Sequence, residues 1–143
     1  MKIERFEDLQ IWQDSRELVK LVWSYTKREA FNKDFKFRDQ IRAAAGSTMD
    51  NIAEGFGRGG NKEFINFLLI AKGSNEETRS QLFRAFDFEY ISKDELTATL
   101  DLTDKISRKI ANLIAYLKES GYKGSKRNNA KEPDILYIPN NIE

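Results

Sequence analysis

Apolar residues recur at intervals of three and four along most of this chain, which is the period of an amphipathic helix with one buried face. The pattern predicts four helices, at about residues 7–28, 35–56, 62–90 and 93–120. No proline occurs before Pro133, so nothing in this part forbids long helices. Short connections favour antiparallel neighbours. The sequence therefore predicts an all-α fold, an antiparallel up-down-up-down four-helix bundle.

Particular residues mark the expected helix ends. Asp34 is a predicted N-cap for the second helix and Asn61 for the third, because a short polar side chain accepts a bond from the first free N–H groups. The glycine-rich run 55–60 should end the second helix, since glycine adopts the left-handed conformation without strain. Ser92, with Glu95 three residues later, predicts a capping box at the start of the fourth helix.

The helical pattern divides the chain into residues 1–120, the bundle, and residues 121–143, a flexible basic tail. The tail's basic residues include Lys123, Lys126 and Arg127. After Pro133 the tail holds a short apolar island, made of Ile135, Leu136, Tyr137 and Ile138. Such an island either docks on a sheet edge or groove of a protein partner, or folds back onto its own bundle or a neighbouring subunit. The sequence leaves both alternatives open.

A polar ladder runs through the second predicted helix. Ser47, Asn51, Glu54 and Arg58 are spaced by four, three and four residues, so they share one face of the helix. Small residues at 43–46 would let another backbone approach closely beside them. We therefore expect this helix, with Gly55 at its end, to be used in packing, including packing between subunits.

The third predicted helix contains Gly73 near its middle, where glycine costs about 1 kcal/mol relative to alanine. Such a cost suggests a close crossing with a neighbouring helix, across which Ser74 could form a hydrogen bond. The alternative is that Gly73 is merely tolerated on a solvent-facing side. Glu77, one turn further on, is another candidate for this packing role.

The chain has neither cysteine nor histidine, and their absence excludes several kinds of chemistry. Thiolate nucleophiles, Ser-His-Asp relays and Glu-x-x-His di-iron sites cannot be built. We expect no metal site and no cofactor. Glu54 and Glu77 could in principle form a catalytic carboxylate pair, but a hydrogen-bonded role in helix packing is the favoured interpretation. The expected protein is not an enzyme.

The amino-terminal residues carry acids where a signal peptide would need an apolar run, and no stretch is long and apolar enough to span a membrane. These features predict a cytoplasmic protein.

Several blocks of this chain resemble the signature of the four-helix-bundle proteins encoded within intervening sequences of 23S ribosomal RNA genes. The first group of matches is Gln40-Ile41-Arg42, Ala44-Ala45, Ser47, residues 51–55 and Gly57-Arg58. Others are Asp8-Leu9 with Trp12, Glu63-Phe64, Phe67-Leu68, and residues 70–74 leading to Glu77, Gln81 and Leu82. The likeness covers about residues 6–120. Ala43 and Asn75 depart from it, standing where the family usually has an arginine and an apolar residue.

The resemblance implies a bacterial all-α bundle that commonly forms a ring-like homopentamer and has no established enzymatic activity. A related branch binds a reverse transcriptase and nucleic acid, so the resemblance favours binding of RNA or a ribonucleoprotein. The alternative is a structural or regulatory ring that binds a protein partner such as a reverse transcriptase. Partner binding, rather than catalysis, is the expected function.

Nucleic-acid binding would need basic residues gathered on one surface, because the total of 24 Lys and Arg against 23 Asp and Glu gives no strong basic excess. Candidates within the bundle are Arg38, Arg42, Arg58 and Lys62, joined by the bases of the tail and repeated around an oligomer. The ten phenylalanines lie mostly at buried spacings and do not suggest base stacking. The alternative is that these basic residues are ordinary solvent-exposed charges without a binding role.

Overall fold

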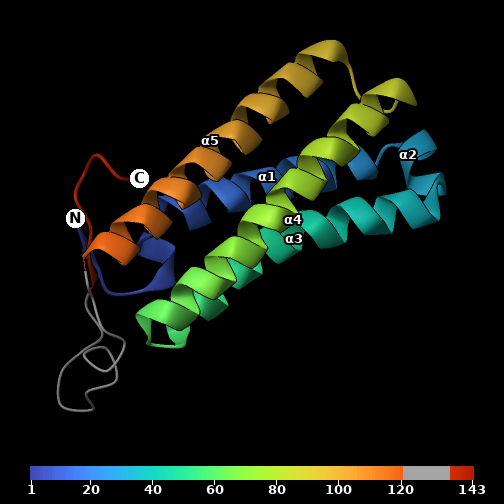
Figure 1. Cartoon of the computed structure of the whole chain (residues 1–143). Coiled ribbons are helices and arrows are strands. Elements are labelled where there is room, and N and C mark those ends of the chain that lie inside the picture. The colour runs from blue at the N-terminus through green and yellow to red at the C-terminus, as the bar shows by residue number, and fades with distance from the viewer. Residues whose placement is uncertain (121–135) are drawn as a thin grey trace.

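The computed structural model describes residues 1–120 and 136–143 of the chain, and helices dominate it (Figure 1). A 3-10 turn, η1, and a single-turn helix, α2, accompany four long helices and two very short strands. The elements in chain order are β1 (Lys2–Ile3), η1 (Phe6–Asp8), α1 (Gln10–Thr26), α2 (Glu29–Lys33), α3 (Phe35–Gly57), α4 (Asn61–Asp87), α5 (Lys93–Glu119) and β2 (Leu136–Tyr137).

The four predicted helices correspond to α1, α3, α4 and α5, so the predicted all-α bundle is confirmed. The first helix is shorter than predicted, because residues 6–8 form a separate 3-10 turn before it. The segment between the first two predicted helices contains α2, whose Phe31 is buried. Phe31 stacks on Phe37 and Tyr90, with ring centroids 5.1 and 4.6 Å away.

The predicted helix ends are partly confirmed. Gly59 has a φ of 80°, so a glycine in the left-handed conformation follows α3 as expected. Ser92 and Glu95 form the predicted capping box at the start of α5. The prediction for Asn61 was wrong, because Gly60 is the N-cap and the Asn61 amide instead donates to the Leu117 carbonyl oxygen at 2.7 Å.

Asp34 lies at the predicted N-cap of α3, but its side chain makes no capping bond. Its Oδ2 accepts a hydrogen bond from the Tyr90 hydroxyl at 2.8 Å. The carboxylate therefore ties the start of α3 to the turn after α4, a long-range use that the sequence pattern did not indicate.

The four long helices are antiparallel neighbours in the cyclic order α1, α3, α4, α5, with α5 closing against α1 (Figure 1). Helices α3 and α4 make the most extensive pair. Between α4 and α5, the fully buried Asn75 donates to the Thr103 carbonyl oxygen at 2.7 Å. This bond explains structurally how an asparagine is accommodated at position 75, where the sequence resemblance led us to expect an apolar residue.

The core is formed by one continuous cluster of aliphatic and aromatic side chains from all four helices. Its largest fully buried helical members are Phe31, Phe64, Ile11, Leu18, Ile41, Ile52, Leu68, Leu82, Ile106 and Ile110. Burial of this apolar surface is the main source of the bundle's stability. No helix in the described part of the chain is long and apolar enough to cross a membrane.

The carboxyl-terminal segment 136–143 folds back onto the bundle, which is one of the two alternatives that the sequence left open. Both chain ends lie at the end of the bundle opposite α2 (Figure 1). Strands β1 and β2 pair antiparallel, and Leu136 and Ile138 are 3% and 1% exposed. These two side chains are therefore packed within the chain in this structure, whereas Tyr137 is 62% exposed. Ile135 and the rest of the predicted tail lie outside the described residues.

Candidate functional site

The polar ladder of α3 is formed largely by bonds within the helix. The Asn51 amide nitrogen donates to the Ser47 carbonyl oxygen at 2.8 Å and to the Ser47 hydroxyl oxygen at 2.9 Å. Arg58 donates to the Glu54 carboxylate at 2.9 Å, and this bond raises the pKa of the Arg58 guanidinium. The ladder therefore stiffens one side of α3, and one of its members also reaches a neighbouring helix.

That neighbour is α4, where the Ser74 hydroxyl donates to the Ser47 hydroxyl oxygen at 3.0 Å. A bond from Ser74 across a helix crossing is what the sequence predicted. Gly73 beside it behaves differently, because a Cβ built there would meet no atom of the described chain within 4 Å. The close crossing predicted at Gly73 is thus not made inside the chain.

The close approach of α3 and α4 lies instead at Gly55. A Cβ at Gly55 would sit 2.5 Å from the Phe67 Cβ and 3.2 Å from the Phe64 ring, so this position admits only glycine without movement of α4. Gly55 is buried, and Arg58 lies over the outer face of the Phe67 ring at 5.3 Å. The α3–α4 interface is therefore fixed by Gly55 at one end and by the serine pair near its middle.

Glu77 lines a shallow polar pocket of about 340 Å³ between α3 and α4, together with Gln40, Ser80, Gln81 and Arg84. Its carboxylate accepts a hydrogen bond from the Gln81 amide at 3.4 Å. Glu54 is engaged elsewhere, by Arg58. In the described residues no hydrogen bond joins the two carboxylates, and no group of three metal-ligating side chains is found there.

Arg42 and Arg38 project from α3 toward α1 and toward the turn containing α2. The Arg42 Nε donates to the Thr26 hydroxyl at 2.8 Å, and its guanidinium lies 4.1 Å above the Trp23 ring. Arg38 bonds Asn32 and Asp39, and its guanidinium lies 5.1 Å from the Phe35 ring. Both candidates for nucleic-acid contact are therefore held in fixed positions against aromatic rings.

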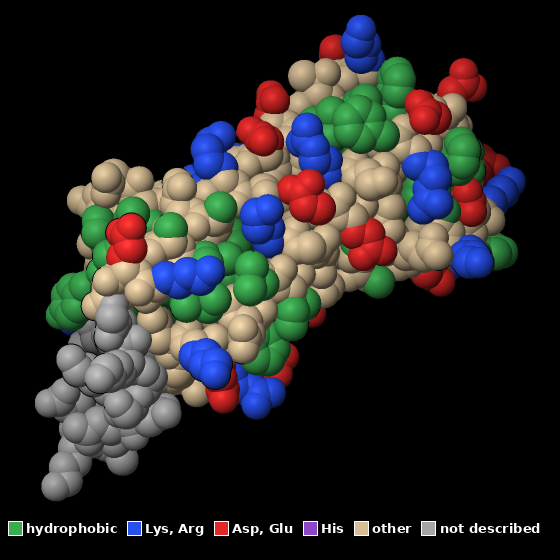
Figure 2. All heavy atoms as spheres, in the orientation of Figure 1, with side chains coloured by type: hydrophobic (Ala, Val, Ile, Leu, Met, Phe, Trp, Pro, Cys, Tyr) green, Lys and Arg blue, Asp and Glu red, His purple; other side chains and the backbone are tan. Residues whose placement is uncertain are grey.

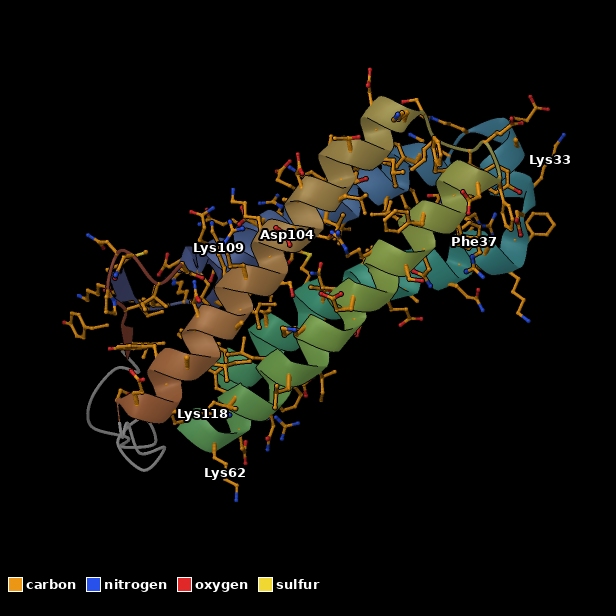
Figure 3. The ribbon with its side chains drawn as sticks, turned by 45° about the horizontal axis from the view of Figure 1, so that its top comes forward. Lys33, Phe37, Lys62, Asp104, Lys109 and Lys118 are labelled. Carbon is orange, nitrogen blue, oxygen red and sulfur yellow. The ribbon has the colours of Figure 1, made fainter. Side chains whose placement is uncertain are left out.

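Arg58 and Lys62 lie at the opposite end of the bundle. Figure 3 shows Lys62 at one end and Phe37, the neighbour of Arg38, at the other. Twenty residues of α3 separate Arg38 from Arg58, which is about 30 Å along the helix axis. The four helical bases do not form one positive patch within a single chain. Lys123, Lys126 and Arg127 fall outside the described residues.

The outer face of α4 exposes apolar side chains around Gly73. Leu69 and Ile70 are 50% and 51% exposed, and both lie within one turn of the glycine. On the face of the molecule turned to the viewer in Figure 2, basic and acidic side chains alternate among green apolar patches. The sequence analysis did not single out Trp23, which is exposed on α1. Its position outside the set of residues that α1 buries could have indicated an exposed aromatic side chain.

The antiparallel four-helix arrangement defines the class of the protein as an all-α bundle. The family model of the 23S rRNA-intervening sequence protein matches residues 7–112 of this chain. The chain therefore belongs to this family. Among curated proteins no match was found.

A solved structure supports the same assignment. It is the crystal structure of a protein of unknown function from the S23 ribosomal protein family of Bacteroides thetaiotaomicron. The two chains share 26% sequence identity and superpose with a TM-score of 0.66, over 73% of this chain and 97% of that one. The similarity thus spans nearly the whole of the solved chain.

Proposed function

We propose that this protein is a non-catalytic, homo-oligomeric scaffold that binds RNA or a ribonucleoprotein. The observation that supports it best is the outer face of α4, where Leu69 and Ile70 are about half exposed beside Gly73, a mid-helix glycine that no other described element approaches closely. A glycine inside a helix costs about 1 kcal/mol. Packing of another helix against that position would offset the cost.

A second copy of this chain is the proposed occupant of the α4 face. Helix α4 carries charges of both signs around these apolar residues, namely Lys62, Glu63, Lys72, Glu76 and Glu77. Such a surface is complementary to another copy of itself, whereas a partner of strong net charge would meet like charges. Assembly would also repeat each basic residue around a ring, so that weak contacts to RNA add up to avid binding.

The alternative function is a ring that captures a protein partner through the apolar island of the tail. The burial of Leu136 and Ile138 removes two of the four residues proposed for that contact. The RNA-binding scaffold is therefore the preferred proposal.

Native mass spectrometry of gently purified protein at low and high salt tests the proposal. We expect an oligomer that carries RNA at low salt and releases it at high salt, because binding to phosphates is opposed by added salt. Ile70→Asp should break the oligomer by placing a charge in the interface, while Ala111→Asp on the exposed side of α5 should leave it intact. A wild-type monomer, or a turnover activity lost with Glu54→Gln or Glu77→Gln, would overturn the proposal.

A further inference from the structure

Three arginine–aromatic pairs lie along the seam between α1 and α3. Arg42 stacks over Trp23 at 4.1 Å, and Arg38 lies over Phe35 at 5.1 Å. Arg16 lies 5.8 Å from the Trp12 ring. We call these six residues the arginine–aromatic row. Neither Arg16 nor any of the three aromatic residues was among the nucleic-acid candidates drawn from the sequence.

The helical geometry places the members of the row in line. Trp12 and Trp23 are eleven residues apart on α1, close to three full turns, so they share one face about 16 Å apart. Arg38 and Arg42 are one turn apart on α3 and also share a face. The bond from Arg42 to Thr26 ties the two helices together and fixes the guanidinium over Trp23.

The aromatic members of the row expose large ring surfaces. Trp23 is 53% exposed and Phe35 is 64% exposed, and neither ring belongs to the hydrophobic core. Trp12 is partly buried against Phe6, with ring centroids 5.0 Å apart. Gly46, one turn after Arg42, has no neighbour within 4 Å of a Cβ position, so open space lies beside α3 there. Arg42 lies over one face of the Trp23 ring and Arg38 over one face of the Phe35 ring, so a flat ligand would approach the parts of these rings that stay exposed.

The charge around the row is positive. Lys20 and Lys27 are exposed on α1, within one turn of Trp23 on either side. Acidic residues are fewer, and two of them are already paired: Asp39 with Arg38 at 2.9 Å, and Glu17 with Lys20 at 3.3 Å. Asp50 is exposed two turns after Arg42. The eight charged residues named here, five basic and three acidic, carry a net charge of +2.

We propose that the arginine–aromatic row binds single-stranded RNA, with unpaired bases stacked on Trp23 and Phe35 and phosphates held by Arg16, Arg38 and Arg42. Aromatic rings stack well on bases of any sequence, and arginine adds both charge and a planar surface. A duplex would bury its bases away from these rings, so single strands are preferred. The excess of basic side chains favours a polyanion over a protein. This inference rests on the RNA binding in the proposed function and names its site.

The test uses the intrinsic fluorescence of the full-length oligomer. Trp12→Phe leaves Trp23 as the single tryptophan, because the chain contains two. We expect its emission to be quenched by an oligouridylate of about 15 nucleotides at low salt, which is within the site sizes of known single-strand binders. A duplex RNA of the same length should quench it much less. Trp23→Leu should weaken binding, measured by anisotropy of labelled RNA, at least about fivefold, as expected for one lost stacking contact.

Substitutions of basic residues distinguish RNA binding at the arginine–aromatic row from RNA binding elsewhere on the surface. Arg16→Ala should weaken binding and lower the slope of log affinity against log salt by about one. Arg58→Ala and Lys62→Ala test the two other helical bases named from the sequence, and Lys118→Ala, at an exposed position of α5, is the matched control that should leave both quantities unchanged. Arg16 makes no bond across helices in the described residues, so its removal should not disturb folding, which circular dichroism would verify.

The outcomes are distinguishable. Trp23→Leu and Arg16→Ala could leave RNA binding unchanged while Arg58→Ala and Lys62→Ala abolish it. That result would show that the arginine–aromatic row is not the RNA site, but it would leave the proposed function intact. Absence of RNA binding at low salt overturns both. If native mass spectrometry shows that Trp23→Leu splits the oligomer, the row is a subunit contact and the inference is wrong.

Discussion

Gly55 and Gly73 are both interior helix glycines, but they have opposite surroundings. Gly55 faces Phe67 so closely that a methyl group does not fit, whereas Gly73 faces open space. Both glycines were assigned from the sequence to packing, and only one packs inside the chain. The environment of a single backbone position depends on which residue a different helix places opposite it.

Alanine substitutions at these two positions should therefore shift stability in opposite directions. Gly55→Ala should lower the free energy of unfolding by about 1–3 kcal/mol through overpacking against Phe67. Gly73→Ala should raise the intrinsic stability of the isolated chain by up to about 1 kcal/mol through higher helix propensity. Urea denaturation at dilute protein concentration measures both. A destabilising Gly73→Ala under those conditions would mean that the glycine is needed within the chain.

Glu89 is a second residue whose backbone conformation matters. Among the described non-glycine residues it alone has a positive φ, 63°, and it ends α4 in the position where glycine is preferred. The Tyr90 amide donates to the Ala85 carbonyl oxygen at 2.9 Å across this turn.

Glu89→Gly should raise the free energy of unfolding by about 0.5–1 kcal/mol, because glycine adopts the left-handed conformation without strain. Thermal denaturation should show a higher Tm. Asp101→Gly, at an exposed helical position of α5, is the control and should lower stability by roughly 0.3 kcal/mol, the difference in helix propensity between the two residues. Equal losses from both changes would contradict the argument.

At the level of elements, the start of α5 is fixed by local and distant contacts together. The Glu95 carboxylate accepts the Ser92 backbone N–H at 2.9 Å, as in a capping box, and forms a bidentate pair with Arg28, the N-cap residue of α2. The bond from Arg28 is the main cause that lowers the pKa of Glu95 from 4.5 to about 2. The capping box between Ser92 and Glu95 was predicted from the sequence, whereas the ion pair of Glu95 with Arg28 was not.

This pKa shift predicts a pH dependence of stability. A carboxyl group with a lowered folded-state pKa stabilises the protein above its unfolded pKa, and the contribution is lost as the pH falls from about 4.5 toward 2. Glu95→Gln should cost about 1 kcal/mol at pH 7, since Arg28 is substantially exposed and the pair is screened by water. The difference from wild type should shrink toward pH 2 in urea titrations. Asp101→Asn should show no such convergence.

At the scale of the whole molecule, the carboxyl-terminal segment closes one end of the bundle. The Ile138 amide donates to the Met1 carbonyl oxygen at 2.8 Å, and the Tyr116 hydroxyl donates to the Tyr137 carbonyl oxygen at 2.9 Å. The Glu143 carboxylate accepts the N–H groups of Gln10 and Ile11 at 2.5 and 3.0 Å, and so caps α1. Burial raises the pKa of Glu143.

Ile138→Ala should lower the free energy of unfolding by about 2–4 kcal/mol, because a fully buried aliphatic side chain is removed and a cavity remains. Tyr137→Ala, its exposed neighbour, is the matched control and should change stability by less than about 0.5 kcal/mol. Chemical denaturation compares the two. Equal, small effects would show that the segment contributes little to the bundle's stability.

The sequence alone determined the four long helices, their antiparallel order, the capping box at Ser92 and the family, but not the short elements η1 and α2. These features follow from periodicity and from residues that act on neighbours within one turn, so a linear pattern records them. Tertiary structure decided which glycine packs, where the apolar island lies, and that Arg38 and Arg42 join exposed aromatic rings far from Arg58. Those outcomes depend on contacts between residues remote in the chain, whose pairing is set by how the four helices dock against one another.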